Sequence, residues 1–413
     1  MANDFKIVGG ISLSLFLGLN INTLKINYLF FLLVICCSCN KPKQASEAGK
    51  GILGAADSLV YYPIEDNRIV VDLDYSQKAS LFDYFSHIEL IPLETNDEVL
   101  IGYCEDLVFY QNRYYIFDRK RAVVQIFDKD GKFISLINKR GQGPGEYTPN
   151  LTSIFLNSFT NNIDITDMGC IYSYDLTGKH VRTTPRNMDA SGFYWNIIPL
   201  NENLYVCFVL LFNSLDACKI NYYDAKENKI LHKEYVEDEF LNKYAQVPTV
   251  PPFYEYNGTY YFYRLVDNQT YEVGMDSLRR AYTWDFGKYN YDAKNLDLPN
   301  DPKSITTLPY IIDIQGQNNR YVMAYIYLRD SERAYLIYDK SIDECKYIKH
   351  FTESVGFLPR KITNEYVLTW YEHGELENYI TEDMLDENNR KKYHELLDAS
   401  EEMNPVIVKY YFK

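Results

Sequence analysis

An aromatic residue followed by an acidic one recurs along this chain at a nearly constant interval. Successive pairs are 47, 49, 48 and 67 residues apart, and the last interval is lengthened by a polar insertion at residues 288–307. The pairs are Phe127-Asp128, Tyr174-Asp175, Tyr223-Asp224, Tyr271-Glu272 and Tyr338-Asp339. A period of roughly 40 to 50 residues, with several strands in each repeat, predicts a β-propeller in which each repeat forms one blade.

The first repeat, residues 106–147, shows what one blade contains. Four runs of aromatic and β-branched residues follow one another at 107–110, 114–117, 123–127 and 133–137. The links between them are short and polar, such as Gln111-Asn112 and Asp130-Gly131. Such runs and links are typical of antiparallel strands joined by tight turns. We therefore predict four-stranded antiparallel blades.

Turn signals give the number of blades. Signals for the turn between a first and a second strand occur six times, whereas those between a third and a fourth strand occur five times. The sixth repeat thus lacks a fourth strand of its own, and residues 87–94, which precede the first repeat, can supply it. Closing the ring in this way removes two open sheet edges. The expected fold is an all-β, six-bladed propeller whose N-terminal strand closes the last blade.

Composition agrees with this fold and excludes one class of partner. The 413 residues include 40 Tyr and 22 Phe, an aromatic content that suits β-sheets. The net charge of −15 argues against nucleic acid as a partner, because phosphate binding needs concentrated Lys and Arg. Apolar residues at mixed three- and four-residue steps predict a helical insertion at about 375–402. This insertion either packs on the propeller and caps its channel, or serves as a lid or partner-docking element.

The N-terminus is interpreted as a lipoprotein signal peptide. Residues 28–35 form a short apolar core after Lys25, and Ser38-Cys39 resembles the site at which bacterial lipoproteins are cleaved and lipidated. We predict a signal peptide at 1–39, lipidation of Cys39, a tether and lead-in at 40–84, and the propeller at 85–413. The alternative, a membrane-spanning anchor, is disfavoured because no apolar run reaches about 20 residues. Whether the anchor lies on the periplasmic or the surface side stays open.

Antiparallel meanders place the loops of a propeller on two faces. Links from first to second and from third to fourth strands emerge on one face, here called the short-turn face. Links from second to third strands, and from blade to blade, emerge on the other, the long-loop face. Nearly all long segments belong to the second set, including 139–149, 237–250 and 288–307. Variable loops on a rigid face are where binding usually occurs, so we expect the long-loop face to carry the site.

Polar residues at equivalent loop positions on this face are the candidate ligand-binding residues. They are Arg119, Arg121, Gln142, Glu146, Tyr147, Arg264 and Arg329. Such residues either form a solvated rim or converge on an acidic or polyhydroxylated ligand. The glycine-rich stretch 140–146 lacks the Lys-Ser/Thr ending and the strand-to-helix context of a phosphate loop. Its glycines are better explained by a tight crossing between blades.

Catalytic and metal-binding signals are sparse. The six His residues are scattered, no nucleophile-elbow motif occurs, and the five Cys residues that follow the N-terminal cluster at 36–39 form no CxxC pair. The dispersed cysteines are expected to be core residues, and a Cys207–Cys218 disulfide across a hairpin is the alternative. No catalytic residue is assigned, and no cofactor is expected. If a metal such as calcium binds in the channel, Asp167, Asp267 and Asp330 are the candidate ligands.

Three stretches carry a resemblance to a known family. Residues 140–147 (RGQGPGEY), 91–95 (IPLET) and 404–408 (NPVIV) resemble the six-bladed β-propeller lipoproteins of Bacteroidetes, which are in turn similar to NHL-like propellers. The resemblance covers about residues 85–413 and implies a propeller held at the cell envelope by a lipid anchor. It also implies that calcium in the channel is a possibility to test, since some six-bladed propellers bind it.

The functional hypothesis that follows is a non-catalytic, membrane-tethered binding or scaffold protein. Its partner would be a protein or glycan ligand at the cell envelope, and only the lipid anchor would contact the membrane. The alternative is an enzyme, a propeller lyase or hydrolase acting at the channel mouth. A third possibility is a structural component of an envelope complex that uses the helical insertion as its contact.

Overall fold

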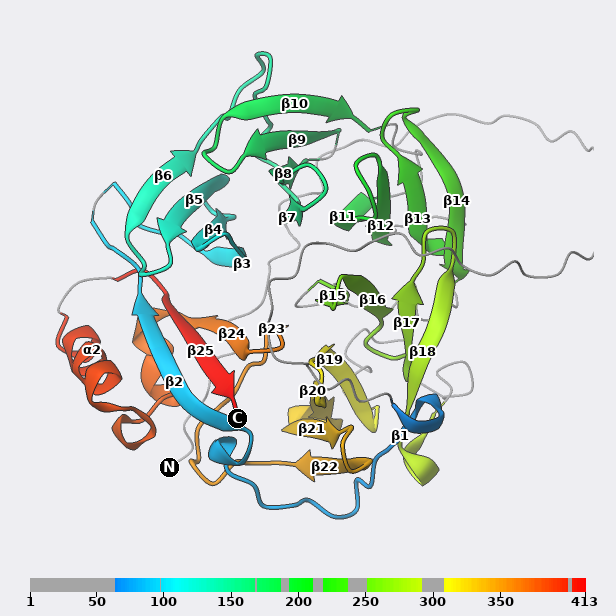
Figure 1. The fold of residues 1–413 in the computed structure, drawn as a ribbon, viewed down its shortest axis with the longest axis vertical. Coiled ribbons are helices and arrows are strands. Elements are labelled where there is room, and N and C mark those ends of the chain that lie inside the picture. Colours follow the sequence, from blue (N-terminus) through cyan, green and yellow to red (C-terminus); the bar gives the residue numbers. More distant parts are fainter. Residues whose placement is uncertain are drawn as a thin grey trace, which may run out of the picture. The chain divides into compact units, whose positions relative to one another are not determined.

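The computed structural model describes residues 64–413, except 97, 168, 187–192, 211–217, 237–250, 292–307 and 400–402. These residues belong to a compact unit, Ser58–Lys413. Six sheets are arranged around a central axis, each with four antiparallel strands from inside to outside, and one of them carries an additional outer strand (Figure 1). The predicted six-bladed propeller is therefore confirmed, and the residues of the predicted signal peptide, including Cys39, lie outside the described part of the chain.

Five blades are built from consecutive strands, with the first strand innermost. Blade 1 comprises β3 (Cys104–Tyr110), β4 (Arg113–Asp118), β5 (Val123–Asp128) and β6 (Phe133–Ile137). Blade 2 comprises β7 (Ser153–Asn157), β8 (Asn162–Thr166), β9 (Cys170–Asp175) and β10 (His180–Pro185). Blade 3 comprises β11 (Phe193–Pro199), β12 (Leu204–Leu210), β13 (Cys218–Asp224) and β14 (Lys229–Val236). Blade 4 comprises β15 (Phe253–Tyr256), β16 (Thr259–Tyr263), β17 (Gln269–Val273) and β18 (Leu278–Asp285). Blade 5 comprises β19 (Tyr310–Gln317), β20 (Tyr321–Leu328), β21 (Arg333–Asp339) and β22 (Glu344–Ile348).

Blade 6 combines the two ends of the propeller. Its inner strands are β23 (Lys361–Ile362), β24 (Tyr366–Tyr371) and β25 (Val406–Phe412), and its outermost strand is β2 (Phe85–Pro92). β2 pairs antiparallel with β25, for example Leu90 with Val408. The predicted closure of the ring by the N-terminal strand is confirmed.

The segment before β2 adds contacts that sequence reasoning did not anticipate. β1 (Arg68–Val70) runs parallel to β18 and forms a fifth strand at the outer edge of blade 4. The chain then passes outside blade 5, where the backbone N–H of Gln77 donates to the carbonyl of Tyr347 at 2.8 Å. Sheet edges with unpaired backbone groups invite aggregation, so this outer strap, residues 68–79, protects two of them.

The helical insertion packs on the outer side of blade 6. It consists of η8 (His373–Asn378), η9 (Glu382–Met384) and α2 (Glu387–Leu397). The side chain of Asn389 accepts a hydrogen bond from Leu90 N–H at 2.9 Å, and Lys392 Nζ donates to the Leu90 carbonyl at 2.8 Å. The expected packing on the propeller is observed, but the expected capping of the channel is wrong, because α2 covers the edge of β2, outside the ring (Figure 1).

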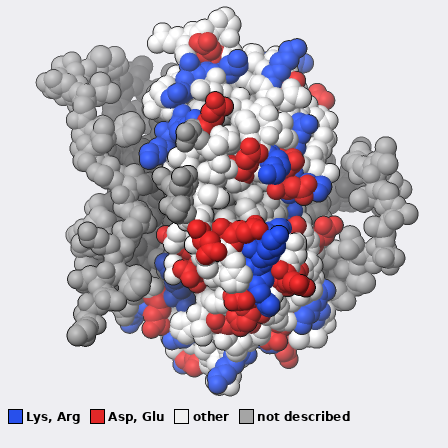
Figure 2. Space-filling model, turned by 90° about the vertical axis from the view of Figure 1, so that its left-hand side faces the viewer, with Lys and Arg blue, Asp and Glu red and all other residues white. Residues whose placement is uncertain are grey.

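Figure 2 shows the side of the molecule that carries β2 and α2. Acidic and basic side chains are interspersed on it. Nucleic-acid binding needs a basic surface of one sign, which this side does not present. No helix among the described residues is long and apolar enough to span a membrane.

The recurring acid has a structural cause. Asp128 Oδ1 accepts hydrogen bonds from the backbone N–H groups of Asp130 and Lys132, both at 2.9 Å. Asp175 accepts in the same way from Thr177 and Lys179, at 2.9 and 3.0 Å. An aspartate at the end of a third strand thus satisfies the N–H groups of the following turn. The repeat marks the third-to-fourth-strand turn of the blade.

Apolar and aromatic side chains between neighbouring blades form the core. Between blades 1 and 2, for example, Tyr115, Ile126, Ile163 and Tyr174 are fully buried. Cys104, Cys170, Cys207, Cys218 and Cys345 form no disulfide with one another. The alternative of a Cys207–Cys218 disulfide is therefore wrong, because Cys207 faces Asn221 across the strand pair.

Candidate functional site: the central cavity

A cavity of about 590 Å³ lies at the axis of the propeller. The innermost strands of all six blades, β3, β7, β11, β15, β19 and β23, contribute to its walls. Several first-to-second-strand turns also line it, so it extends to the mouth on the short-turn face. A cavity of a few hundred Å³ is the size of a small-molecule site.

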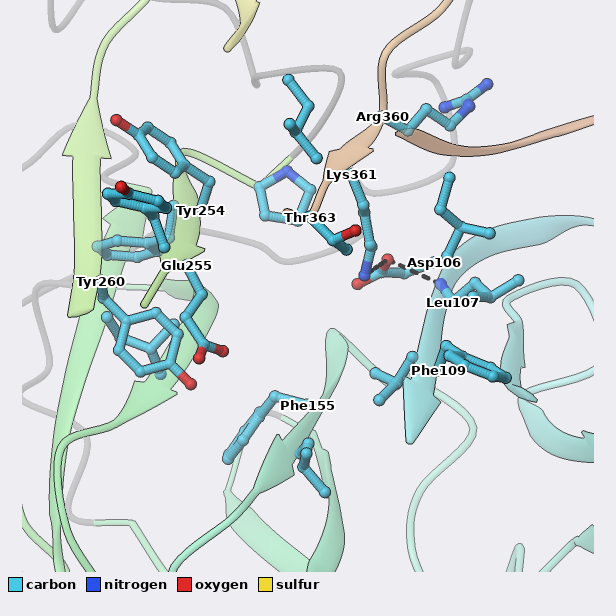
Figure 3. A pocket seen from close by; sticks show the side chains of 18 of the residues that line it. Asp106, Leu107, Phe109, Phe155, Tyr254, Glu255, Tyr260, Arg360, Lys361 and Thr363 are labelled. Atoms are coloured by element: carbon cyan, nitrogen blue, oxygen red, sulfur yellow. Dashed lines mark hydrogen bonds and ion pairs between the residues drawn. The ribbon is translucent and has the colours of Figure 1, made fainter. Parts of the chain in front are cut away.

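The wall formed by blade 4 is rich in tyrosine (Figure 3). The ring of Tyr254 stacks on that of Tyr261, with centroids 5.0 Å apart. Its hydroxyl lies 2.9 Å from that of Tyr282, and Gln317 Nε2 donates to it at 3.2 Å. These contacts hold the ring in one position, which makes this wall a preformed surface.

Glu255 lies on the same wall, and its side chain is exposed to the cavity (Figure 3). Among the described residues it makes no hydrogen bond and no ion pair. Burial within the ring raises the pKa of its carboxyl above the usual value. Burial also raises the pKa of the neighbouring Tyr260 hydroxyl, and the Glu255 charge adds to this effect. The cavity therefore contains a carboxylate that the described protein does not neutralise.

The opposite wall, from blades 1 and 6, carries an ion pair. Lys361 Nζ lies 2.8 Å from Asp106 Oδ1, and the same carboxyl accepts from Leu107 N–H at 2.7 Å. Beside this pair, the guanidinium carbon of Arg360 lies 4.6 Å from the centroid of the Trp370 ring. Blades 1 and 4 face each other across the six-bladed ring, so the ion pair faces Glu255 across the cavity (Figure 3).

Asparagines from three blades join at the short-turn mouth. Asn364 Nδ2 donates to Asn257 Oδ1 at 2.8 Å, and Asn257 Nδ2 donates to Asn319 Oδ1 at 3.1 Å. Each is part of a first-to-second-strand turn, and these contacts confirm that such turns share one face. The amides tie blades 4, 5 and 6 together at the end of the cavity.

A buried lysine stands beside this asparagine bridge. Lys340 Nζ donates to Gln317 Oε1 at 2.8 Å and to the Asn318 carbonyl at 2.7 Å. It also lies 4.6 Å from the centroid of the Tyr256 ring. Burial lowers the pKa of Lys340 to about 7. Its charge state is therefore coupled to the packing of two residues that line the cavity, Gln317 and Tyr256.

The candidate residues of blade 1 hold the long-loop face together. Tyr147 is fully buried, and its hydroxyl lies 3.1 Å from the carbonyls of both Ala122 and Ile137. Arg121 donates to the Leu100 carbonyl, and Arg119 pairs with Glu105 at 3.2 Å. Tyr147 and Arg121 are thus used within the protein, whereas Arg119 keeps part of its surface exposed.

The other candidates are spread over three blade positions. Glu146 folds back on its own loop and accepts from Gly143 N–H at 2.8 Å, while Gln142 is exposed. Arg264 is buried, with its guanidinium carbon 5.0 Å from the Phe208 ring centroid. Arg329 is exposed at the start of η7 (Arg329–Ser331). None of the seven candidates is among the described residues that line the cavity.

Two of the aspartates considered for calcium accept hydrogen bonds from neighbouring protein groups. Asp167 is buried and accepts hydrogen bonds from Gly169 and Cys170 N–H and from the Thr148 and Tyr172 hydroxyls. Asp267 accepts from the hydroxyls of Tyr235 and Tyr271 at 2.8 and 3.0 Å. The side chain of Asp330 lies outside the described part. No group of three or more His, Cys, Asp or Glu side chains in the described ranges is arranged to hold a metal ion.

Sequence reasoning missed Asp106, Glu255 and Lys361. Each is a charged residue in or next to the first strand of a blade, within sequences such as FYEYNG and RKITN. Charges in an innermost strand were the available signal, because such a strand borders the channel. The prediction from loop positions did not consider charged residues within these strands.

These features define a six-bladed β-propeller with a polar and aromatic central cavity. The chain belongs to the family described as "Domain of unknown function (DUF4934)", which matches residues 67–411. Among solved structures it is similar to an inferred exported protein of Bacteroides fragilis, with 16% identity and a TM-score of 0.61, covering 84% of this chain and 98% of that one. It also matches a member of the duf4221 family from Bacteroides vulgatus, with 11% identity and a TM-score of 0.47, covering 80% and 97% of the two chains. No curated protein matches the chain.

Proposed function

We propose that this protein is a non-catalytic binding protein of the cell envelope that holds a small ligand in its central cavity. The cavity carries the proposal, because it combines fixed tyrosine rings with Glu255 on one side and the Asp106–Lys361 pair on the other. Apolar walls with a few convergent polar groups are typical of ligand sites. A preformed site of this kind keeps the ordering cost of binding low.

The place of action in this proposal is the outside of the cytoplasmic membrane. It is supported by the lipobox-like Ser38-Cys39 and by the fold similarity to the inferred exported protein of Bacteroides fragilis. The lipid anchor would hold the propeller at the membrane through the tether, as expected for a lipidated cysteine followed by a polar linker. The long-loop face, with Gln142 and Arg329 exposed, is the proposed second contact surface for a larger protein or glycan partner.

Ligand capture by matched variants tests the proposal. The full chain is incubated with the small-molecule fraction of an envelope extract, and bound compounds are released and identified by mass spectrometry. Tyr260→Ala alters the cavity wall at a side chain whose hydroxyl has no hydrogen-bond partner among the described residues. A control pair, Gln142→Ala with Arg329→Ala, alters the long-loop face.

The expected result is that Tyr260→Ala releases much less ligand than the wild type and that the control pair releases as much. Equal capture by Tyr260→Ala and the wild type would overturn the cavity as the binding site. Loss of capture in the control pair alone would move the site to the long-loop face.

An enzyme acting in the cavity is the second candidate, and Glu255 favours it. A carboxyl with a raised pKa in a cavity has the property of a general acid. Hydrolysis or elimination by such an acid would consume the captured compound. Mass spectrometry of the released compounds over time separates the two candidates, because a binding protein returns its ligand unchanged.

A further inference from the structure

We infer that the cavity selects ligands that carry an ammonium group, with Glu255 as the anionic partner and the rings of Tyr254 and Tyr260 as the surface beside it. This inference rests on the proposed binding function and names the chemistry of its ligand. Three features support it: the unpaired carboxylate of Glu255, the aromatic rings around it, and the acid of the opposite wall, which already has a lysine partner.

The charge of Glu255 lacks a counter-charge within the described protein. Its carboxylate forms neither an ion pair nor a hydrogen bond among the described residues, although the ring of blades surrounds it. Removing a carboxylate from bulk water without a partner is costly. A ligand ammonium that binds there would supply the missing partner, and the attraction is stronger in a cavity than in open water.

The aromatic side chains around Glu255 favour a cation rather than a neutral group. Tyr254 and Tyr260 flank Glu255 on the same wall, and Phe155 lies across the open space below them (Figure 3). The face of an aromatic ring attracts an ammonium group within about 6 Å of its centroid. The protein uses this interaction elsewhere. Lys409 Nζ lies 4.3 Å from the Phe109 centroid and 4.7 Å from that of Tyr366.

The opposite wall behaves differently because its acid is already neutralised. Asp106 has Lys361 at 2.8 Å, so the described residues of this wall offer a ligand no unpaired negative charge. A ligand ammonium is therefore directed to the blade 4 wall. The Lys361 ammonium can still donate to an oxygen at the other end of the ligand, because a lysine has three donors. The favoured ligand is an amine with hydroxyl or carboxylate oxygens at its far end.

Matched probe pairs test the inference by isothermal titration calorimetry on the full chain. The pairs are phenethylamine with 2-phenylethanol, and glucosamine with glucose; within each pair the ammonium replaces a neutral group. We expect the amine to bind at least about ten-fold more tightly than its neutral partner, a difference of about 1.4 kcal/mol. Glu255→Gln should reduce this ratio to about one.

Two further variants separate a charge effect from a structural one. Glu255→Asp keeps the charge on a shorter side chain and should retain a preference for the amines. Glu98→Gln removes an exposed carboxylate that does not line the cavity and should behave as the wild type. Equal binding within each pair, no binding of either amine at about 1 mM, or a preference that survives Glu255→Gln would overturn the inference.

The two failures are distinguishable. If Tyr260→Ala loses the envelope ligand while amines show no preference, the cavity binds but the inferred chemistry is wrong. If Tyr260→Ala captures the ligand fully, the cavity is not the site and the proposed function itself fails.

Discussion

Asp164, in β8 of blade 2, is a carboxyl whose removal should stabilise the protein at neutral pH. It is fully buried, and Oδ1 has no hydrogen-bond partner among the described residues. Oδ2 lies 3.5 Å from both Asn157 Nδ2 and Tyr205 Oη, at the limit of a hydrogen bond. Burial raises the pKa of Asp164 from 3.8 to about 6, although the neighbouring Ser173 hydroxyl and then the Arg182 guanidinium partly oppose this shift.

The sign of the pH effect follows from this shift. Well below pH 3.8 the carboxyl is protonated in both the folded and the unfolded chain and contributes nothing to the pH dependence. Between pH 3.8 and about 6 the unfolded chain loses the proton first, so the free energy of unfolding falls as pH rises. A shift of about two units corresponds to about 3 kcal/mol, which is fully lost at pH 7.5.

Asp164→Asn removes the ionisation and nearly preserves the shape. We expect its free energy of unfolding to exceed that of the wild type by up to about 3 kcal/mol at pH 7.5, and the difference to shrink towards pH 4. Denaturant unfolding of both proteins at the two pH values measures this. Asp167→Asn is the matched control. The Asp167 carboxylate accepts five hydrogen bonds, so this variant should lose about 1–3 kcal/mol in free energy of unfolding. An Asp164→Asn protein that is less stable at pH 7.5, or a difference independent of pH, would refute the reasoning.

Three further predictions concern other parts of the chain. Burial lowers the pKa of Lys340 to about 7, so Lys340 binds its proton more weakly in the folded chain than in the unfolded chain. Between pH 7 and 9 the free energy of unfolding of the wild type should therefore rise by about 2–3 kcal/mol relative to that of Lys340→Met, as measured by denaturant unfolding. The same pH dependence of stability in both proteins would contradict this. Asn389→Ala leaves the Leu90 N–H without its partner and should lower the free energy of unfolding by about 1–3 kcal/mol. The substitution Asn388→Ala at the exposed neighbouring position should change it little, and equal effects would argue against the contact between α2 and the edge of β2. Cys39→Ala should move the protein from the membrane fraction to the soluble envelope fraction on immunoblots, and retention in the membrane would exclude lipidation at this cysteine.

The propeller could be predicted because its signals are local. Turn residues and the recurring aspartates, such as Asp128 and Asp175, act on backbone groups a few positions away, so their pattern survives in a single sequence. The missing fourth strand of blade 6 followed from counting. The outer strap at 68–79 could not be predicted in this way, because its pairing with β18 and with Tyr347 depends on which outer edges the closed ring leaves open.

The candidate site was less predictable because it depends on long-range geometry. Glu255 and Lys361 are 106 positions apart and meet only across the channel, and no local pattern relates them. Tyr147 shows the opposite difficulty: it follows a polar, glycine-rich loop, yet it is fully buried between blades 1 and 2. Loop position alone does not determine whether a side chain faces the solvent or the core.

The pairing of β2 with β25 has a consequence for how the protein matures. β2 precedes the other blade strands in the sequence and β25 follows them, so the final blade cannot form until the whole propeller has been synthesised. Contacts between such distant segments form slowly because they close a very long loop. Until then β2 and β24 each lack the neighbour that β25 supplies. A chain cut short before residue 406 would keep these strands open, which gives proteases a structural basis for distinguishing it from a chain that contains β25.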